Sequence, residues 1–458
     1  MKKGLYFTYL FVGTTMLAFS ATAQELLIEQ TTMPQIAPAQ VPKGAVDTKI
    51  EKGRDTLPAV QTPVDQKIDE SKEKAVLQTN MPKSVKQRQE HARQRHALAK
   101  QESFAQKYAD FKQDLNNKMG LSYSLDISIM GQRGAPNGKG TPWQTQYYGS
   151  VDWNMYKSKI GDGSLQFAYT DIHYWGKSGA WLNNRLALAS ELNDYTSNEH
   201  YFDQLTYTHT LPGDFSWLSV SFGQFPMYNW DGTEYDSNQQ TNFINMALSQ
   251  NASSTYPSAS LGGFVTVTPN SNWQFAAGFQ DANNTTGSKI DTHTFHEKKF
   301  TSFVSASFTP TIKDLGAGQY SILLYNQPGV EEQPGTTNGW SINVAQSFGE
   351  KWALFGRVNG NTGVEPIKQS YVLGTVYNNP LNRNALDQIG FAAAVNKLNK
   401  NVNGSGTRSV ETVLEAYWAW GLSNFVTITP DVQFYINPGL DSDKNTATVA
   451  SIRATFMF

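Results

Sequence analysis

The sequence contains no cysteine, which excludes disulfide-stapled folds and metal sites built on thiolates. Beyond its N-terminal segment it also lacks any apolar run approaching the roughly 20 residues that a membrane-spanning helix needs. Its mean hydropathy is −0.46, and a helical membrane protein would be much more apolar. These absences leave open a protein that crosses a membrane with strands, in which only alternate residues need to be apolar.

The N-terminus predicts a signal peptide over residues 1–23. Lys2 and Lys3 precede an apolar segment at residues 5–19, and Ala21-Thr22-Ala23 supplies the small residues of a cleavage site. The alternative is an uncleaved membrane anchor, but the apolar segment is short and a cleavage site follows it. We therefore expect the mature chain to be exported and to begin at Gln24.

Residues 24–82 are polar, contain few aromatic residues and are interrupted by six prolines. Such a segment buries too little apolar surface to fold alone, so it is predicted to be a disordered periplasmic linker.

Residues 83–118 contain neither proline nor glycine and are predicted to form an amphipathic periplasmic helix. Phe104, Tyr108, Phe111 and Leu115 share one helical face, which could pack on the mouth of a barrel. Small apolar residues seven positions apart leave a short coiled coil, and hence a homo-oligomer, open. The many basic residues of the segment fit a solvated helix face in an exported protein, so no nucleic-acid partner is expected.

From residue 119 to 458 the apolar pattern has a period of two. The final residues 450–458 show it clearly, because Ile452 and Phe456 alternate with Ser451, Arg453 and Thr455. Strand-like segments of about ten residues recur, joined alternately by short turns and by long polar loops. We count 16 or 17 strands, and a single-chain barrel favours the even number. The predicted fold class is all-β: a transmembrane antiparallel β-barrel in the Gram-negative outer membrane, surrounded by lipid and enclosing a water-filled channel.

The charge of the predicted barrel argues against an anion pore. Residues 119–458 contain 26 Asp and Glu against 19 Lys and Arg. An acidic interior disfavours phosphate and other anions as solutes.

Polar and aromatic residues near the C-terminus have the strand parity of the channel-facing side. Sugars bind where an aromatic ring packs on their CH groups and carboxylates or amides bind their hydroxyls. Arg357 and Arg453 could supply opposing positive charge, while ordinary barrel-wall electrostatics remains the alternative for every member. The channel-lining or sugar-binding candidates are Glu411, Glu415, Tyr417, Asp431, Gln433, Tyr435, Arg453 and Arg357.

Several segments resemble the OprB-type carbohydrate-selective porin family. They are Phe222-Gly223-Gln224-Phe225, residues 241–245, residues 256–263, residues 278–283 and, most specifically, residues 429–439 with their Pro-Asp-x-Gln-x-x-x-Asn-Pro-Gly pattern. The resemblance implies a 16-stranded barrel for passive diffusion of small saccharides and related polar solutes, without a cofactor. The terminal Phe458 is similar to the signal read by the outer-membrane barrel assembly machinery.

Two other functions are alternatives to a porin. A conduit for polysaccharide export would use a similar channel wall, and the periplasmic helix could dock an export partner. A barrel-embedded enzyme is disfavoured because no nucleophile-elbow motif occurs. His293 and His296 form a possible metal pair but have no clear third ligand, so neither a metal site nor catalytic residues are predicted.

Overall fold

The computed structural model describes residues 103–136, 138–363 and 365–458, all of which belong to one unit, Ile68–Phe458. The predicted signal peptide and linker, and residues 83–102 of the predicted helix, lie outside the described residues. Among the described residues no helix combines the length and the apolarity needed to cross a membrane.

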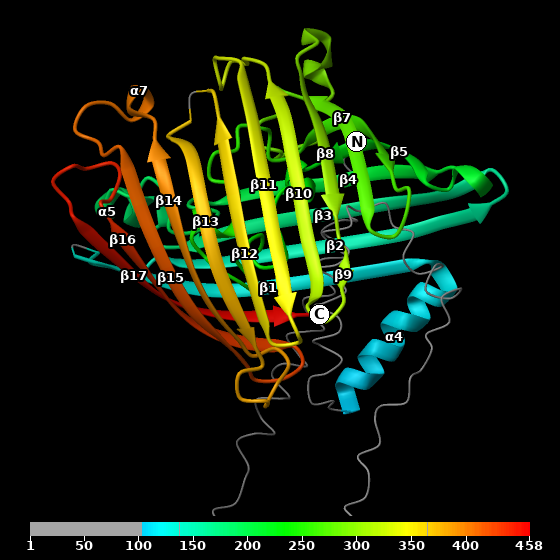
Figure 1. Ribbon diagram of the computed structural model, residues 1–458, viewed down its shortest axis with the longest axis horizontal. Coiled ribbons are helices and arrows are strands. Elements are labelled where there is room, and N and C mark those ends of the chain that lie inside the picture. The colour runs from blue at the N-terminus through cyan, green and yellow to red at the C-terminus, as the bar shows by residue number, and fades with distance from the viewer. Residues whose placement is uncertain (1–102, 137, 364) are drawn as a thin grey trace, which may run out of the picture. The chain divides into compact units, whose positions relative to one another are not determined.

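The described part of the chain is a closed antiparallel β-barrel preceded by one helix (Figure 1). Its strands are β1 (Leu121–Ala135), β2 (Trp143–Ser158), β3 (Gly161–Trp175), β4 (Glu199–Thr210), β5 (Leu218–Phe225), β6 (Ser260–Val267), β7 (Trp273–Asp281), β8 (Phe300–Phe308), β9 (Thr311–Ile312), β10 (Gly316–Gln327), β11 (Thr337–Phe348), β12 (Trp352–Asn361), β13 (Ile367–Asn378), β14 (Gln388–Leu398), β15 (Val410–Gly421), β16 (Val426–Ile436) and β17 (Thr446–Met457). Its helical segments are α4 (Ser103–Met119), α5 (Gly179–Leu186), η1 (Gly213–Phe215), η2 (Met227–Trp230), α6 (Met246–Ser249), η3 (His293–Glu297) and α7 (Lys400–Asn403).

The first and last strands close the barrel. β1 pairs with β17 from Asp126 opposite Met457 to Ala135 opposite Thr448. Elsewhere each long strand pairs with its neighbour in sequence, and β8 pairs with β10 because β9 is a two-residue extension beside β10. The described residues thus contain sixteen long strands and one short one, which confirms the predicted fold class and strand number.

The two ends of the barrel differ. One end carries the start of β1, the end of β17 and short connections such as residues 159–160 and 349–351. The other carries longer loops, among them residues 176–198, 226–259, 282–299 and 399–409. We call these the short-turn end and the long-loop end; in an outer-membrane barrel they face the periplasm and the exterior.

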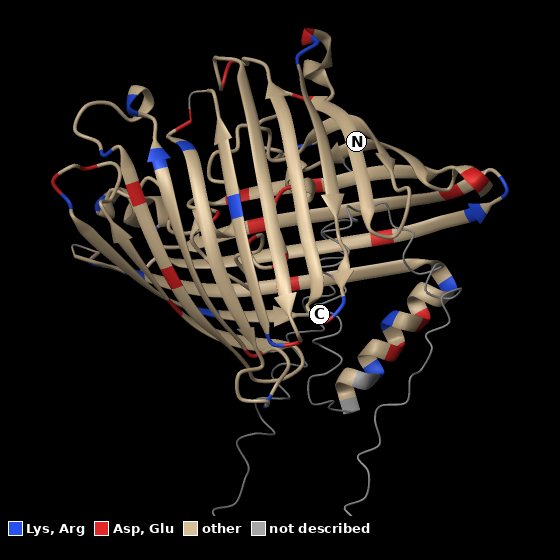
Figure 2. Ribbon diagram, viewed as in Figure 1, with Lys and Arg blue, Asp and Glu red and all other residues tan. Residues whose placement is uncertain are grey.

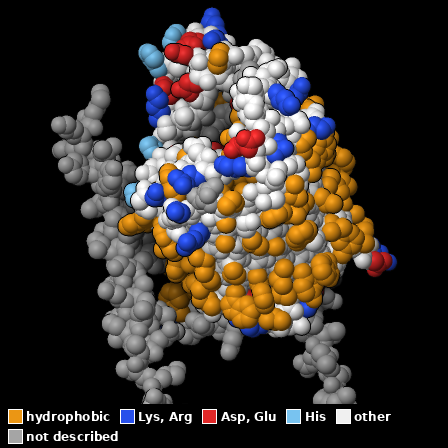
Figure 3. Space-filling model, turned by 90° about the vertical axis from the view of Figure 1, so that its left-hand side faces the viewer, with side chains coloured by type: hydrophobic (Ala, Val, Ile, Leu, Met, Phe, Trp, Pro, Cys, Tyr) orange, Lys and Arg blue, Asp and Glu red, His pale blue; other side chains and the backbone are white. Residues whose placement is uncertain are grey.

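Strand parity separates the two faces of the wall. On β17 the outward Ile452 is 52% exposed, whereas the inward Arg453 and Thr455 are buried. Outward apolar side chains of successive strands merge into a broad field on the wall, while charged side chains gather around the loops (Figure 3). Seven tryptophans near strand ends are more than a third exposed on this surface, as interfacial aromatics of a barrel are: Trp143, Trp153, Trp175, Trp217, Trp273, Trp352 and Trp418.

Candidate functional site

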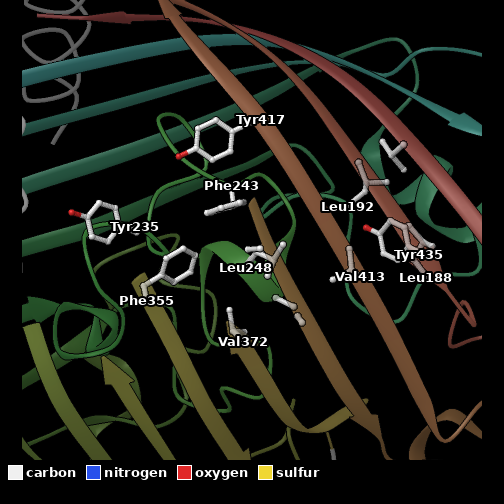
Figure 4. Close-up of a cluster of buried hydrophobic side chains, with 14 of the residues drawn as sticks. Leu188, Leu192, Tyr235, Phe243, Leu248, Phe355, Val372, Val413, Tyr417 and Tyr435 are labelled. Carbon is white, nitrogen blue, oxygen red and sulfur yellow. The ribbon is translucent and has the colours of Figure 1, made fainter. Parts of the chain in front are cut away.

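Two long loops fold into the barrel instead of extending from it. We call residues 176–198, which include α5, the first inner loop, and residues 226–259, which include η2 and α6, the second inner loop. Leu188, Leu192, Phe243 and Leu248 from these loops are fully buried against inward side chains of the wall such as Phe355 (Figure 4). An apolar core therefore fixes both loops inside the barrel.

The eight residues predicted from the sequence do point inward, but they lie beneath the inner loops. Each is at most 6% exposed. None of the eight is among the residues that line a cavity of about 1000 Å³ inside the barrel. The inner loops cover this part of the wall, and the assignment of these eight residues as channel-lining or sugar-binding stays a prediction.

Glu411 and Glu415 on β15 hold backbone amides of the inner loops. The Glu411 carboxylate accepts hydrogen bonds from the N–H groups of Ala189, at 2.8 Å, and Ser190, at 2.7 Å. The Glu415 carboxylate accepts from the N–H groups of Ile244 and Asn245. Hydrogen bonds to a charged acceptor are among the stronger ones in proteins, so both carboxylates anchor loop backbone to the wall.

Three more of the predicted residues continue this anchoring on β16 and β17. The Asn245 amide donates to the Tyr435 hydroxyl at 2.6 Å, and that hydroxyl donates to Gln433 at 2.8 Å. The Gln433 amide donates to the Leu192 carbonyl, and the Arg453 guanidinium donates to the Asn242 carbonyl at 3.0 Å. These side chains therefore fasten both inner loops to adjacent strands.

The other three predicted residues also form buried polar contacts on the inner face of the wall. Arg357 on β12 forms a buried ion pair with Asp236 of the second inner loop, 2.7 Å between Nη2 and Oδ2. The Tyr417 hydroxyl donates to Gln388 on the neighbouring strand. Asp431 on β16 interacts electrostatically with Glu415 on β15 and Arg453 on β17. Arg357 and Arg453 engage different parts of the second inner loop and do not form a shared positive patch.

A cavity of about 1000 Å³ remains inside the barrel between the inner loops, the wall and α4. Its lining contains six carboxylates and one basic side chain, Lys112; the carboxylates are those of Asp126, Asp152, Asp194, Asp203, Asp231 and Glu234. Tyrosines of α4, of the barrel wall and of the inner loops also line the cavity: Tyr108, Tyr123, Tyr148, Tyr195, Tyr228 and Tyr256. The cavity is thus acidic and rich in phenol rings and hydroxyls.

The acidic groups of the cavity differ in how they are held. Asp231 accepts hydrogen bonds from Asn251, at 2.8 Å, from Tyr256, at 3.0 Å, and from Ser341, so its carboxylate is fixed between the second inner loop and β11. Asp194 accepts a hydrogen bond from the Ser249 hydroxyl, and burial raises the pKa of its carboxyl to about 8. Burial therefore favours the neutral form of the Asp194 carboxyl.

The possible metal pair His293 and His296 is not among the residues that line this cavity. His293 and His296 are in η3 of the β7–β8 loop, with ring centroids 5.5 Å apart. Within the described ranges no group of three or more potential metal ligands is found.

Comparison with known proteins identifies the family. Residues 144–458 match the family described as carbohydrate-selective porin, OprB family. The chain belongs to the OprB porin family. Porin AaxA of Chlamydia felis is 43% identical over 317 residues, covering 69% of this chain and 71% of that protein. Porin AaxA of Chlamydia trachomatis serovar L2 is 36% identical over 368 residues, covering 75% and 79%. The protein is accordingly an outer-membrane porin, and its family indicates a channel rather than an enzyme.

A solved structure agrees with the fold of this porin. The high-pH structure of Pseudomonas putida OprB superposes with a TM-score of 0.65 at 16% sequence identity, over 77% of this chain and 97% of that one. At this identity the likeness concerns the fold alone.

Sequence reasoning missed the residues that line the porin's cavity, although part of the signal was present. Asp126 and Asp152 have the inward parity on β1 and β2 and could have been selected from the alternation. Asp194, Asp231 and Glu234 come from the inner loops, where no periodic pattern shows which side chains reach the interior.

Proposed function

We propose that this porin mediates passive diffusion of small carbohydrates and related polar solutes across the outer membrane. The observation that carries the proposal is the acidic, tyrosine-lined cavity of about 1000 Å³ enclosed by the barrel and its inner loops. Its size suits small solutes better than a polymer chain, which favours diffusion over polysaccharide export.

The lining offers the groups that a sugar needs. Carboxylate and amide oxygens accept hydrogen bonds from hydroxyls, and phenol faces pack on sugar CH groups. The cavity is lined by Tyr148 and by four amide side chains of the second inner loop: Asn238, Gln239, Gln240 and Asn242. Each contact is expected to be weak, because a diffusing solute must also leave.

The excess of carboxylates supports a second candidate class, small organic cations. Besides Asp194, five carboxylates stand against one lysine in the cavity lining. They make the local potential negative, which concentrates cations and repels anions. Solutes with an ammonium or guanidinium group would then pass faster than neutral solutes of the same size.

Liposome swelling separates the two candidates. Purified porin in liposomes is tested with glucose, and with glutamine, lysine and glutamate as neutral, cationic and anionic solutes of similar size. Rapid entry of glucose, together with similar entry rates for glutamine and lysine, supports the carbohydrate channel. Entry of lysine much faster than that of glucose and glutamine supports the cation channel. Absence of swelling with every solute contradicts both.

A matched pair of variants tests whether the cavity is the path. Asp126→Asn combined with Asp152→Asn removes two cavity carboxylates and should reduce the preference for lysine over glutamate. Asp443→Asn removes an exposed carboxylate in the β16–β17 loop and should leave that preference unchanged. Equal behaviour of the two variants would place the solute path elsewhere.

A further inference from the structure

Helix α4 belongs to the wall of the cavity. It lies at the short-turn end (Figure 1), and seven of its residues line the cavity: Ala105, Tyr108, Ala109, Lys112, Gln113, Asn116 and Asn117. The apolar face expected from the sequence is only partly covered, since Phe104 and Phe111 are 52% and 54% exposed. The face turned to the cavity is instead largely polar.

Aromatic contacts fix α4 to the β15–β16 turn, and a hydrogen bond fixes it to β1. The rings of Phe104 and Tyr108 pack edge-on against Phe425 in the β15–β16 turn, with centroids 5.8 and 5.7 Å from it. Phe425 in turn stacks on the terminal Phe458 at 5.8 Å. Asn116 also donates a hydrogen bond to Ser122 of β1. The helix is therefore docked at both ends and not only tethered through the chain.

Lys112 is the basic residue of the cavity lining, and its position is defined on two sides. Its ammonium lies 4.8 Å from the ring centroid of Tyr123 on β1 and 5.5 Å from that of Tyr108 on α4. It also interacts electrostatically with Asp126, one of the cavity carboxylates. Cation–π contacts and a carboxylate together hold the charge at the cavity surface.

We propose that Lys112 is a selectivity-determining residue that places a fixed positive charge in the short-turn mouth of an otherwise acidic channel. This inference rests on the proposed channel function and adds α4 to the conducting path. The ammonium partly offsets Asp126 and repels cations passing beside it, so it limits the cation preference that the carboxylates create. Anions passing the same mouth meet a lower barrier.

The natural absence of cysteine permits a direct test by charge replacement. Lys112→Cys removes the charge, and methanethiosulfonate reagents then attach either a positive or a negative group through a disulfide. The permeability ratio of potassium to chloride is measured for single channels in planar bilayers. We expect the ratio to rise about twofold in Lys112→Cys, to return to the wild-type value with the positive reagent, and to rise further with the negative one.

Lys118→Cys is the matched control on the same helix. Lys118 pairs with Asp114 at 2.6 Å, its side chain is 71% exposed, and it does not line the cavity. Labelling it should leave the permeability ratio unchanged. Recovery of wild-type selectivity by the positive reagent also shows that Lys112→Cys has folded.

The outcomes separate this inference from the proposed function. Wild-type protein without any conductance contradicts the channel itself. If the protein conducts but the selectivity of Lys112→Cys is the same before and after labelling, the result contradicts the role of Lys112 and leaves the channel function intact. An equal response at Lys118 would show that distant surface charge, and not a mouth residue, sets the ratio.

Discussion

The Arg357 guanidinium and the Asp236 carboxylate form an ion pair of 2.7 Å, with both side chains essentially inaccessible to solvent. The first belongs to β12 and the second to the second inner loop, so one pair joins the wall to the chain that narrows the channel. The Arg357 Nε also donates to Asn343 on β11 at 3.0 Å, which orients the guanidinium toward the loop.

Arg357→Met should release the second inner loop. It leaves the buried Asp236 carboxylate without its counter-charge, at a cost of about 3–5 kcal/mol. We expect higher single-channel conductance and faster proteolysis within residues 226–259. Arg383→Met breaks the partly exposed pair with Asp387 in the β13–β14 turn and serves as the control. If both variants conduct like wild type, the ion pair does not hold the loop.

Glu415 and Asp431 should influence ion selectivity less than Asp126 and Asp152. The first two lie under the second inner loop, whereas the second two line the cavity. We expect the variant with Glu415→Gln and Asp431→Asn to keep most of the wild-type cation preference, and the variant with Asp126→Asn and Asp152→Asn to lose most of its own. Reversal potentials in a salt gradient measure both, and the opposite ranking would show that the path runs along β15 and β16.

Glu415→Ala should loosen the loop more than Glu415→Gln. Alanine leaves the N–H groups of Ile244 and Asn245 without an acceptor, at about 1–3 kcal/mol for each buried donor, whereas glutamine retains one acceptor oxygen. Hydrogen exchange at residues 243–246 should therefore be faster in the alanine variant. Equal exchange in the two variants would indicate that other contacts suffice to hold this backbone.

Cation preference should increase above neutral pH through Asp194. Burial raises the pKa of its carboxyl to about 8, and Glu415 and Glu191 raise it further, while Ser249 and Arg357 act in the opposite direction. The folded-state pKa exceeds the ordinary value of 3.8, so the associated stabilisation is complete below about pH 4 and is lost as the pH rises through about 8. Ionisation over that upper range adds a negative charge to the cavity.

Selectivity measured from pH 6 to pH 9 checks this expectation. The wild-type potassium-to-chloride ratio should rise by about twofold, and Asp194→Asn should remove the rise. Asp443→Asn leaves Asp194 in place, so this control variant should show the same rise in the ratio as wild type. A flat wild-type profile, or an unchanged profile in Asp194→Asn, would contradict the assignment.

Leu373→Arg should destabilise the barrel in lipid. Leu373 is 69% exposed at the middle of β13, on the outward face. A basic residue near the membrane midplane of such a barrel costs about 2–4 kcal/mol. Denaturant unfolding in lipid vesicles measures the loss, and Leu422→Arg in the β15–β16 turn should cost much less. Equal losses would place Leu373 away from the hydrocarbon core.

Charged side chains occur on several strands of the barrel (Figure 2), and the alternation of the sequence predicts only which face of the wall each one points to. Parity correctly placed Glu415, Tyr435 and Arg453 on the inner face, because successive side chains of a strand point to opposite sides. It could not show that these groups are covered. Ile244, whose amide binds Glu415, is 171 positions away along the chain, and no local pattern encodes such a contact.

The sequence by itself determined the barrel and narrowed its strand number to 16 or 17. It also indicated the facing direction of residues in the clearest strands, because a period of two follows from strand geometry and from lipid on one side of the wall. Only the tertiary structure decided which inward residues meet the cavity. Two loops pack into the interior and bury apolar and polar groups against the wall, so Glu411 and Glu415 hold backbone while Asp126, Asp152 and Lys112 face the open space. That packing depends on contacts between segments that are far apart in the sequence, and no local pattern encodes such contacts.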